Sequence, residues 1–302
     1  MVARNRLMHE GAISASRQLR ESGIDAMLFK GTALIGRCLP PQGLRSIADI
    51  DIWVRPSQRD EALRCFGSRS HWREPKVKAE LVHDPIGREI DIHYLPSHLL
   101  PHRMGSEQEA ERLFENSWNR RIGLELELSD LVYYSTLNPL FQHPPRSTRA
   151  SFTLIELDSI LTRIPASKDV IARVVAKAIS DATVPVFIDH FDWLGRGASP
   201  ALDAIYESFE AAQSDDEKAR RPWFQHLHMN GDIDSGFTQN RRLVALIKCD
   251  VTSTRMSVLW FIFQGYSHMM RQNPRRFAGK FFRKSAWRNF FMMFDGLVRF
   301  PR

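Results

Sequence analysis

Two aspartates alternate with apolar residues in the run Ile-Ala-Asp-Ile-Asp-Ile-Trp-Val at residues 47–54. In a strand, side chains two residues apart point to the same face, so we expect Asp49 and Asp51 to lie side by side. Ile50 and Ile52 then pack on the opposite face. Two like charges this close repel each other unless a cation neutralises them. Because carboxylate oxygens are the ligands that Mg²⁺ prefers, the run predicts a strand that carries half of a metal site.

A second acidic run, Arg-Glu-Ile-Asp-Ile-His, occupies residues 88–93. The same period of two places Glu89, Asp91 and His93 on one face of a strand. A third carboxylate from this neighbouring strand would complete a site for two divalent ions, which activate an attacking oxygen and stabilise leaving phosphate oxygens. On spacing alone, either Glu89 or Asp91 can be the third acid.

The triplet Lys30-Gly31-Thr32 stands where a short apolar strand at residues 24–29 ends. A glycine lets the backbone approach a triphosphate closely, and the Lys30 ammonium, the Thr32 hydroxyl and nearby N–H groups could contact phosphate oxygens. A plain turn between a strand and a helix is the alternative interpretation of the same triplet. Arg45 and His93 are accessory candidates, with packing or ion pairing as their alternatives.

Hydrophobic periodicity and breaker residues predict an α+β domain at residues 1–128 followed by a mostly α-helical domain at residues 129–302. The predicted elements of the first domain are helices at 5–21, 33–39 and 56–67 and strands at 24–29, 47–54, 76–83 and 88–95. In the second domain the predicted helices lie near 129–142, 148–163, 167–182, 184–193, 200–213, 237–247 and 253–271.

Three widely spaced cysteines without a CxxC pair argue against a disulfide framework or a zinc site and favour a reducing compartment. The first ten residues carry charges and no apolar core, so no secretory signal is expected. No stretch reaches the roughly 18–20 apolar residues of a membrane span. We therefore expect a cytoplasmic protein.

The net charge of +7 is concentrated near the C-terminus, where residues 271–302 hold nine Lys or Arg and one acid, Asp295. Phenylalanines and Trp287 are interleaved with lysines and arginines over residues 274–302. Such a segment is typical of an RNA-binding surface or of a helix lying on an anionic membrane. A terminal helix that packs its aromatics and solvates its basic face is the third interpretation.

Three blocks of the sequence together resemble the polymerase-β-type nucleotidyltransferase superfamily. They are Phe-Lys-Gly-Thr-Ala-Leu at 29–34, Gly-Leu-Arg-Ser-Ile-Ala-Asp-Ile-Asp at 43–51 and Glu-Ile-Asp-Ile-His-Tyr at 89–94. More narrowly, the blocks are similar to a largely uncharacterised bacterial nucleotidyltransferase family with a KGxAL turn, a GLRxxxDID strand and an EIDxHW-like strand. The resemblance extends over residues 1–165, and the Gly-Thr turn departs from the superfamily's usual Gly-Ser or Gly-Gly pair.

The resemblance implies a polymerase-β-like catalytic domain with a small mixed sheet, and a role for each matching residue. Asp49, Asp51 and Asp91 become metal ligands for Mg²⁺ or Mn²⁺, with Asp91 as third ligand or base. The triphosphate contacts implied are Lys30, Gly31 and Thr32, with Arg45 and His93 as accessory nucleotide-binding residues.

The activity implied is metal-dependent transfer of an NMP from an NTP, ATP among them, to an acceptor hydroxyl on a small molecule, a peptide or tRNA. Two alternatives belong to other classes: a catalytically idle nucleotidyltransferase fold that only binds, and a protein of RNA or membrane surfaces that acts through its basic tail.

Overall fold

The computed structural model describes residues 2–35, 37–40, 46–47, 49–66, 79–83, 89–94, 107–120, 123–142, 148–164, 167–181, 183–194, 197–215 and 218. The chain forms two compact units, Met1–Ala212 and Gln213–Arg302. The fold described below is that of the first unit.

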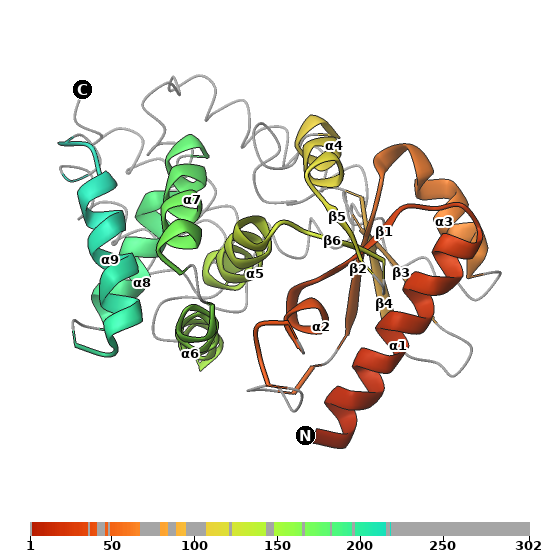
Figure 1. The fold of residues 1–302 in the computed structure, drawn as a ribbon, viewed down its shortest axis with the longest axis horizontal. Coiled ribbons are helices and arrows are strands. Elements are labelled where there is room, and N and C mark those ends of the chain that lie inside the picture. Colours follow the sequence, from red (N-terminus) through yellow and green to blue (C-terminus); the bar gives the residue numbers. More distant parts are fainter. Residues whose placement is uncertain are drawn as a thin grey trace, which may run out of the picture. The chain divides into compact units, whose positions relative to one another are not determined.

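A six-stranded mixed sheet organises the N-terminal part of this unit (Figure 1). Its strands are β1 (Ala26–Phe29), β2 (Ile50–Val54), β3 (Ala79–His83), β4 (Glu89–His93), β5 (Trp118–Arg120) and β6 (Gly123–Glu125), in the order β3-β4-β2-β1-β6-β5. The pairs β2–β4 and β1–β6 are parallel and the other pairs are antiparallel. The predicted α+β class with a small mixed sheet is confirmed.

One face of the sheet is apolar and is covered by α1 (Val2–Glu21) and α3 (Arg59–Cys65). Ile50, Ile52 and Val54 of β2 point into this core, together with alternate residues of β1 and β4. The helix α1 contributes side chains at helical spacing, so one stripe of it is buried. The residues between these apolar positions therefore face the opposite side of the sheet, where the acids lie. Buried core side chains of α1 are Met8, Ala12, Ala15 and Leu19.

Helices make up the rest of the described part of this unit. The short α2 (Lys30–Leu34) follows β1 directly, and α4 (Glu107–Glu115) precedes β5. After β6 the described residues form α5 (Leu128–Gln142), α6 (Thr148–Arg163), α7 (Ser167–Ser180), α8 (Val184–Leu194) and α9 (Pro200–Ala212). Stacked rings of Tyr133, Phe187 and Phe209 join α5, α8 and α9, with ring centroids 6.1 and 4.5 Å apart.

The element predictions agree with the structure for strands β1 to β4 and for the helices α1, α3 and α5 to α9, with shifts at their ends. The helix predicted at 33–39 is wrong, because the helix begins directly after β1 as α2 (Lys30–Leu34) and the described residues that follow it up to 40 are not helical. The strand β2 begins at Ile50 rather than at residue 47, so Asp49 precedes it. The sequence patterns did not predict α4, β5 or β6. The division at residues 128 and 129 stays a prediction. The helices near 237–247 and 253–271 and the tail at 274–302 lie outside the described residues.

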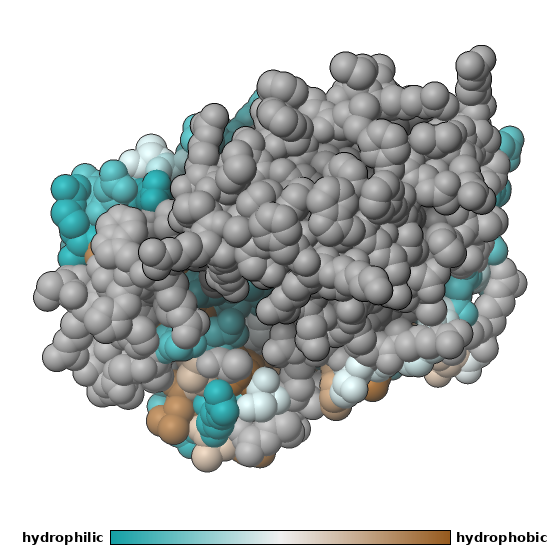
Figure 2. Space-filling model, turned by 180° about the vertical axis from the view of Figure 1, so that it is seen from behind, coloured by the Kyte–Doolittle hydropathy of each residue, from teal (hydrophilic) through white to brown (hydrophobic). Residues whose placement is uncertain are grey.

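The surface of the described part carries scattered large hydrophobic side chains. Seen from behind in Figure 2, the coloured residues are mostly hydrophilic, with small hydrophobic groups along the lower edge. The exposed large hydrophobics are Val2, Leu7, Phe152, Ile155 and Ile179. Among the described helices, none has the length and apolarity needed to cross a membrane.

Candidate functional site

Asp51, Asp91 and His93 meet on the second face of the sheet. Asp51 of β2 lies opposite Asp91 of β4 in the parallel register, and Trp53 lies opposite His93. Since β4 residues two apart share a face, His93 stands beside the pair. One ligand atom from each of the three residues lies within 4.8 Å of the others. Each side chain is at least nine-tenths buried, so this is a compact buried group of metal-binding chemistry.

Asp51 is held by two cationic or proton-donating partners. His93 Nε2 lies 2.7 Å from Asp51 Oδ1, and the Lys30 ammonium donates to the same oxygen. Burial acts to raise the pKa of the Asp51 carboxyl, but the Lys30 charge and the His93 hydrogen bond outweigh burial and hold this pKa well below its ordinary value. The carboxylate is therefore ionised inside the protein and requires positive charge nearby.

Lys30 supplies that charge from the start of α2, directly after β1. Burial acts to lower the pKa of the Lys30 ammonium, but Asp51, Asp49 and Asp91 together outweigh it and raise the pKa. Lys30 has a φ of 52°, in the left-handed region that residues other than glycine rarely adopt. The turn thus holds a charged lysine over the acids in an unfavourable backbone conformation.

Asp49 is half-buried and lies just before β2, and it is not a member of the group formed by Asp51, Asp91 and His93. Burial raises the pKa of the Asp49 carboxyl, and the charges of Asp51 and Asp91 raise it further against the opposing charge of Lys30. The structure therefore brings Asp49 within electrostatic reach of both acids. Asp49 lies in a bend before β2, whereas the sequence predicted Asp49 inside the strand.

Thr32 points into the protein. Its side chain is 1 % exposed, and its hydroxyl donates to Phe29 O at 3.0 Å. The structure thus uses this hydroxyl to close the turn between β1 and α2, whereas the sequence suggested a phosphate contact. Gly31 lies between Lys30 and Thr32 in the same short helix.

The helix α1 positions both the turn and the acidic strand, which the sequence patterns did not indicate. Ile47 N donates to Asn5 Oδ1 at 2.9 Å, and Arg4 Nε donates to Ile47 O at 3.0 Å. One turn later, His9 Nδ1 lies 3.1 Å from Thr32 O. Asn5 is fully buried. An asparagine on the apolar face of a predicted helix is the sequence signal that could have revealed this contact.

Aromatic rings flank the acids on the same face of the sheet. Phe29 stacks on Trp53 with ring centroids 4.1 Å apart and meets His93 edge-on at 6.0 Å. Tyr134 of α5 meets Trp53 edge-on at 5.6 Å. All three rings are buried, and such apolar surroundings strengthen the electrostatic interactions of the buried carboxylates.

Glu89 and Arg45 are the remaining predicted site residues. Glu89 is exposed at the first position of β4, while Asp91 is buried opposite Asp51. Geometry therefore favours Asp91 as the third acid. Arg45 lies outside the described residues.

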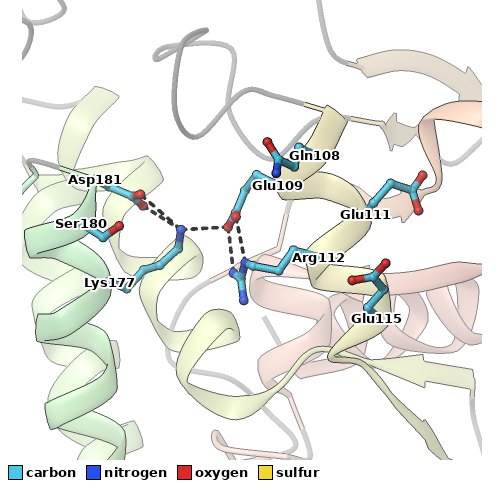
Figure 3. Close-up of a pocket in the computed structure, with 8 residues that line it drawn as sticks. All are labelled: Gln108, Glu109, Glu111, Arg112, Glu115, Lys177, Ser180 and Asp181. Atoms are coloured by element: carbon cyan, nitrogen blue, oxygen red, sulfur yellow. Dashed lines mark hydrogen bonds and ion pairs between the residues drawn. The ribbon is translucent and has the colours of Figure 1, made fainter.

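A second charged cluster links α4 to α7 beside a cleft of about 780 Å³ (Figure 3). Glu109 Oε1 lies 2.8 Å from both Arg112 Nη2 and Lys177 Nζ, and it accepts a hydrogen bond of 2.6 Å from Tyr134 Oη. Lys177 Nζ also lies 3.0 Å from Asp181. These groups pair with one another, so the cluster connects α4 to α5 and α7.

The donor set on the sheet face fits a divalent ion. Two buried carboxylates stand opposite each other with a third close by, and their negative charge already draws in Lys30. Hard divalent cations prefer such oxygen ligands. His93 Nε2 approaches Asp51 at hydrogen-bonding distance, which is the arrangement that fixes the orientation of a ligating carboxylate.

One comparison with known proteins found a match. Residues 1–138 match the model of a family described as uncharacterised nucleotidyltransferase. Searches of curated proteins and of solved structures found no match. The matched residues include the turn at Lys30, both acidic strands and most of α5. Residues 1–138 are therefore similar to the uncharacterised nucleotidyltransferase family, whose model covers them.

Proposed function

We propose that this protein is a metal-dependent nucleotidyltransferase that moves an NMP from an NTP to the hydroxyl of an acceptor. The observation that carries the proposal is the register pair of buried Asp51 and Asp91, held under the Lys30 ammonium. The match of residues 1–138 to the uncharacterised nucleotidyltransferase family supports the reaction class.

In the proposed reaction, the acceptor oxygen forms a bond to the α-phosphorus as the bond from that phosphorus to the oxygen bridging to the β-phosphorus breaks. Pyrophosphate leaves, and the acceptor proton passes to Asp91. Divalent ions, Mg²⁺ or Mn²⁺, when bound by Asp49, Asp51 and Asp91, supply positive charge for the attacking and leaving oxygens.

The chain's own residues bind and orient the reactants in this proposal. The Lys30 ammonium contacts the triphosphate, with Gly31 allowing close approach of the backbone. Thr32 keeps the turn in shape through its bond to Phe29 O. His93 acts through Asp51, whose orientation it fixes by a hydrogen bond.

The matched pair Asp91→Asn and Glu89→Gln tests the proposal. Asp91→Asn is expected to abolish uptake of label from α-labelled NTPs in cell extract with Mg²⁺ or Mn²⁺, because it removes a charged donor opposite Asp51. Glu89→Gln should retain activity within a few-fold, because Glu89 is exposed at the end of β4. The measurement compares label incorporation at equal protein concentration.

Equal activity of the two variants, or loss in Glu89→Gln with activity kept in Asp91→Asn, would reject the assignment of Asp91. The fraction of the extract that takes up label identifies the acceptor as tRNA, peptide or small molecule.

A further inference from the structure

The Lys30 ammonium is paired with Asp51, and a lysine that only contacts phosphate does not need this ion pair. The Lys30 ammonium donates to Asp51 Oδ1, and His93 Nε2 lies at hydrogen-bonding distance from the same oxygen. The Lys30 side chain is 26 % exposed, so it lies at the mouth of the site, whereas the Asp51 side chain is 5 % exposed. One ammonium thus lies between the buried acids and the exterior.

The backbone at Lys30 is arranged to hold the ammonium there. Among the described residues other than glycine, Lys30 alone has a positive φ. The following residues keep this conformation in place, because Thr32 donates to Phe29 O and Thr32 O is bonded to His9. A strained conformation that the surroundings enforce is often part of a mechanism.

We propose, resting on the proposed function, that the Lys30 ammonium is an internal cation that competes with the divalent ion for Asp51 and moves to the triphosphate once the ion has displaced it. A cation bound at Asp51 Oδ1 would stand next to the ammonium, and two positive charges at one oxygen repel each other. Lys30 therefore leaves Asp51 when the divalent ion binds, and the phosphate oxygens become its new partner.

This exchange keeps the acids neutralised at every stage. With Lys30 on Asp51, the buried carboxylates have a partner without a bound metal, and an unpaired buried carboxylate would be costly. With the NTP in place, Lys30 neutralises phosphate instead. The divalent ion and the triphosphate thus favour each other's binding, and Lys30 carries part of that coupling.

Binding of Mn²⁺ alone to the full-length chain tests the inference without any turnover. Lys30→Met is expected to bind Mn²⁺ more tightly than the wild type by roughly 5–150-fold, the usual range for a coupling between two sites. Methionine keeps an unbranched side chain at the positive φ, so the backbone strain is matched. Lys30→Arg retains a cation and should bind Mn²⁺ as the wild type does. Free Mn²⁺ is measured by its electron paramagnetic resonance signal.

Lys177→Met is the matched control, because Lys177 also pairs with two carboxylates but lies in the cluster on α4 and α7. Its affinity for Mn²⁺ should equal that of the wild type. Thermal unfolding followed by circular dichroism verifies that each variant is folded.

Chemical labelling of Lys30 provides a second test, because it reports whether Mn²⁺ changes the surroundings of the amine. Acetylation of wild-type Lys30, quantified by mass spectrometry, should become faster when Mn²⁺ is added, because the ammonium leaves Asp51. Adding tripolyphosphate with the Mn²⁺ should slow it again. An acetylation rate that Mn²⁺ does not change, or equal Mn²⁺ affinity of Lys30→Met and wild type, overturns the inference and leaves the proposed function standing. Absence of Mn²⁺ binding to the wild type and to Lys30→Met overturns both.

Discussion

Asp51→Asn is expected to lower the rate of nucleotidyl transfer by at least about a thousandfold, because a metal-held site contributes several kcal/mol of charge stabilisation to the transition state and each 1.4 kcal/mol is tenfold in rate. The substituted asparagine would keep the shape of the side chain but lose the negative charge that Lys30 and His93 surround. The rate is measured as α-label transferred to the acceptor at saturating NTP.

Asp25→Asn is the matched control for this substitution. Asp25 also pairs with a cation, since Arg55 Nε lies 2.7 Å from Asp25 Oδ2, but it precedes β1 at the end remote from Lys30. Asp25→Asn should retain nucleotidyl-transfer activity within a few-fold. Any decrease in its rate measures the effect of breaking an ion pair away from the site. Transfer by Asp51→Asn at the rate of Asp25→Asn would contradict the catalytic assignment.

Glu109→Gln is expected to lower the free energy of unfolding by about 2 kcal/mol, because removing one partner of a partly buried ionic network leaves the other charges uncompensated, with some screening by solvent. Arg112 and Lys177 both rely on the Glu109 carboxylate. Burial acts to raise the pKa of Glu109, but Arg112, Lys177 and Tyr134 outweigh it and lower the pKa to about 2. Urea unfolding at about pH 7 measures the difference.

The pH dependence of this difference follows from the lowered pKa. A glutamate has an ordinary pKa of 4.5 and Glu109 about 2 when folded. Its stabilisation is therefore complete above the ordinary pKa and is lost as the pH falls towards 2. Burial raises the pKa of Asp130 and Asp181, and the Glu109 charge raises both further, which acts in the opposite direction. The comparison of Glu109→Gln with wild type therefore reports Glu109 together with its effect on these two acids.

Glu115→Gln serves as the control on the same helix, because Glu115 is exposed. A surface substitution of this kind changes stability by less than about 0.5 kcal/mol. The account fails if Glu109→Gln and Glu115→Gln unfold at the same urea concentration, or if the Glu109 difference grows at lower pH.

Alternation of acids with apolar residues was sufficient to predict the central strands. A period of two is a strong signal when one face is buried, and Ile50, Ile52, Ile90 and Ile92 supply that face. The same period placed Asp51 and Asp91 on one side, and the register then set them opposite each other. The choice between Glu89 and Asp91 stays a prediction, because both share the period; their burial differs, and it favours Asp91.

The elements that were missed carry weaker local signals. Strands β5 and β6 have three residues each, too few to show an alternation. The helix α4 is mostly charged, and only the spacing of Ala110, Leu113 and Phe114 marks its buried stripe. Within the cluster at Glu109, the pairs Glu109–Arg112 and Lys177–Asp181 have helical spacing. The contact between Glu109 and Lys177 joins distant parts of the chain, and no spacing rule predicts it.

The phosphate contact of Thr32 stays a prediction, and the structure shows the Thr32 hydroxyl bonded within its own turn. A threonine after glycine offers its hydroxyl equally to a phosphate or to the backbone of its own turn. The tight passage from β1 into α2 leaves Phe29 O within reach of that hydroxyl, and the local bond forms. The choice depends on the three-dimensional path of the turn, which composition does not specify.

Parallel reactions with α-labelled and γ-labelled NTP test the central claim most directly. The protein, Mg²⁺ or Mn²⁺ and cell extract are incubated with each label for all four NTPs, and the acceptor fraction is separated from nucleotides. Nucleotidyl transfer predicts that the α-label enters the acceptor while the γ-label leaves as pyrophosphate, with both reactions lost in Asp51→Asn. Entry of the γ-label into the acceptor, or no entry of the α-label from any NTP, would contradict the claim.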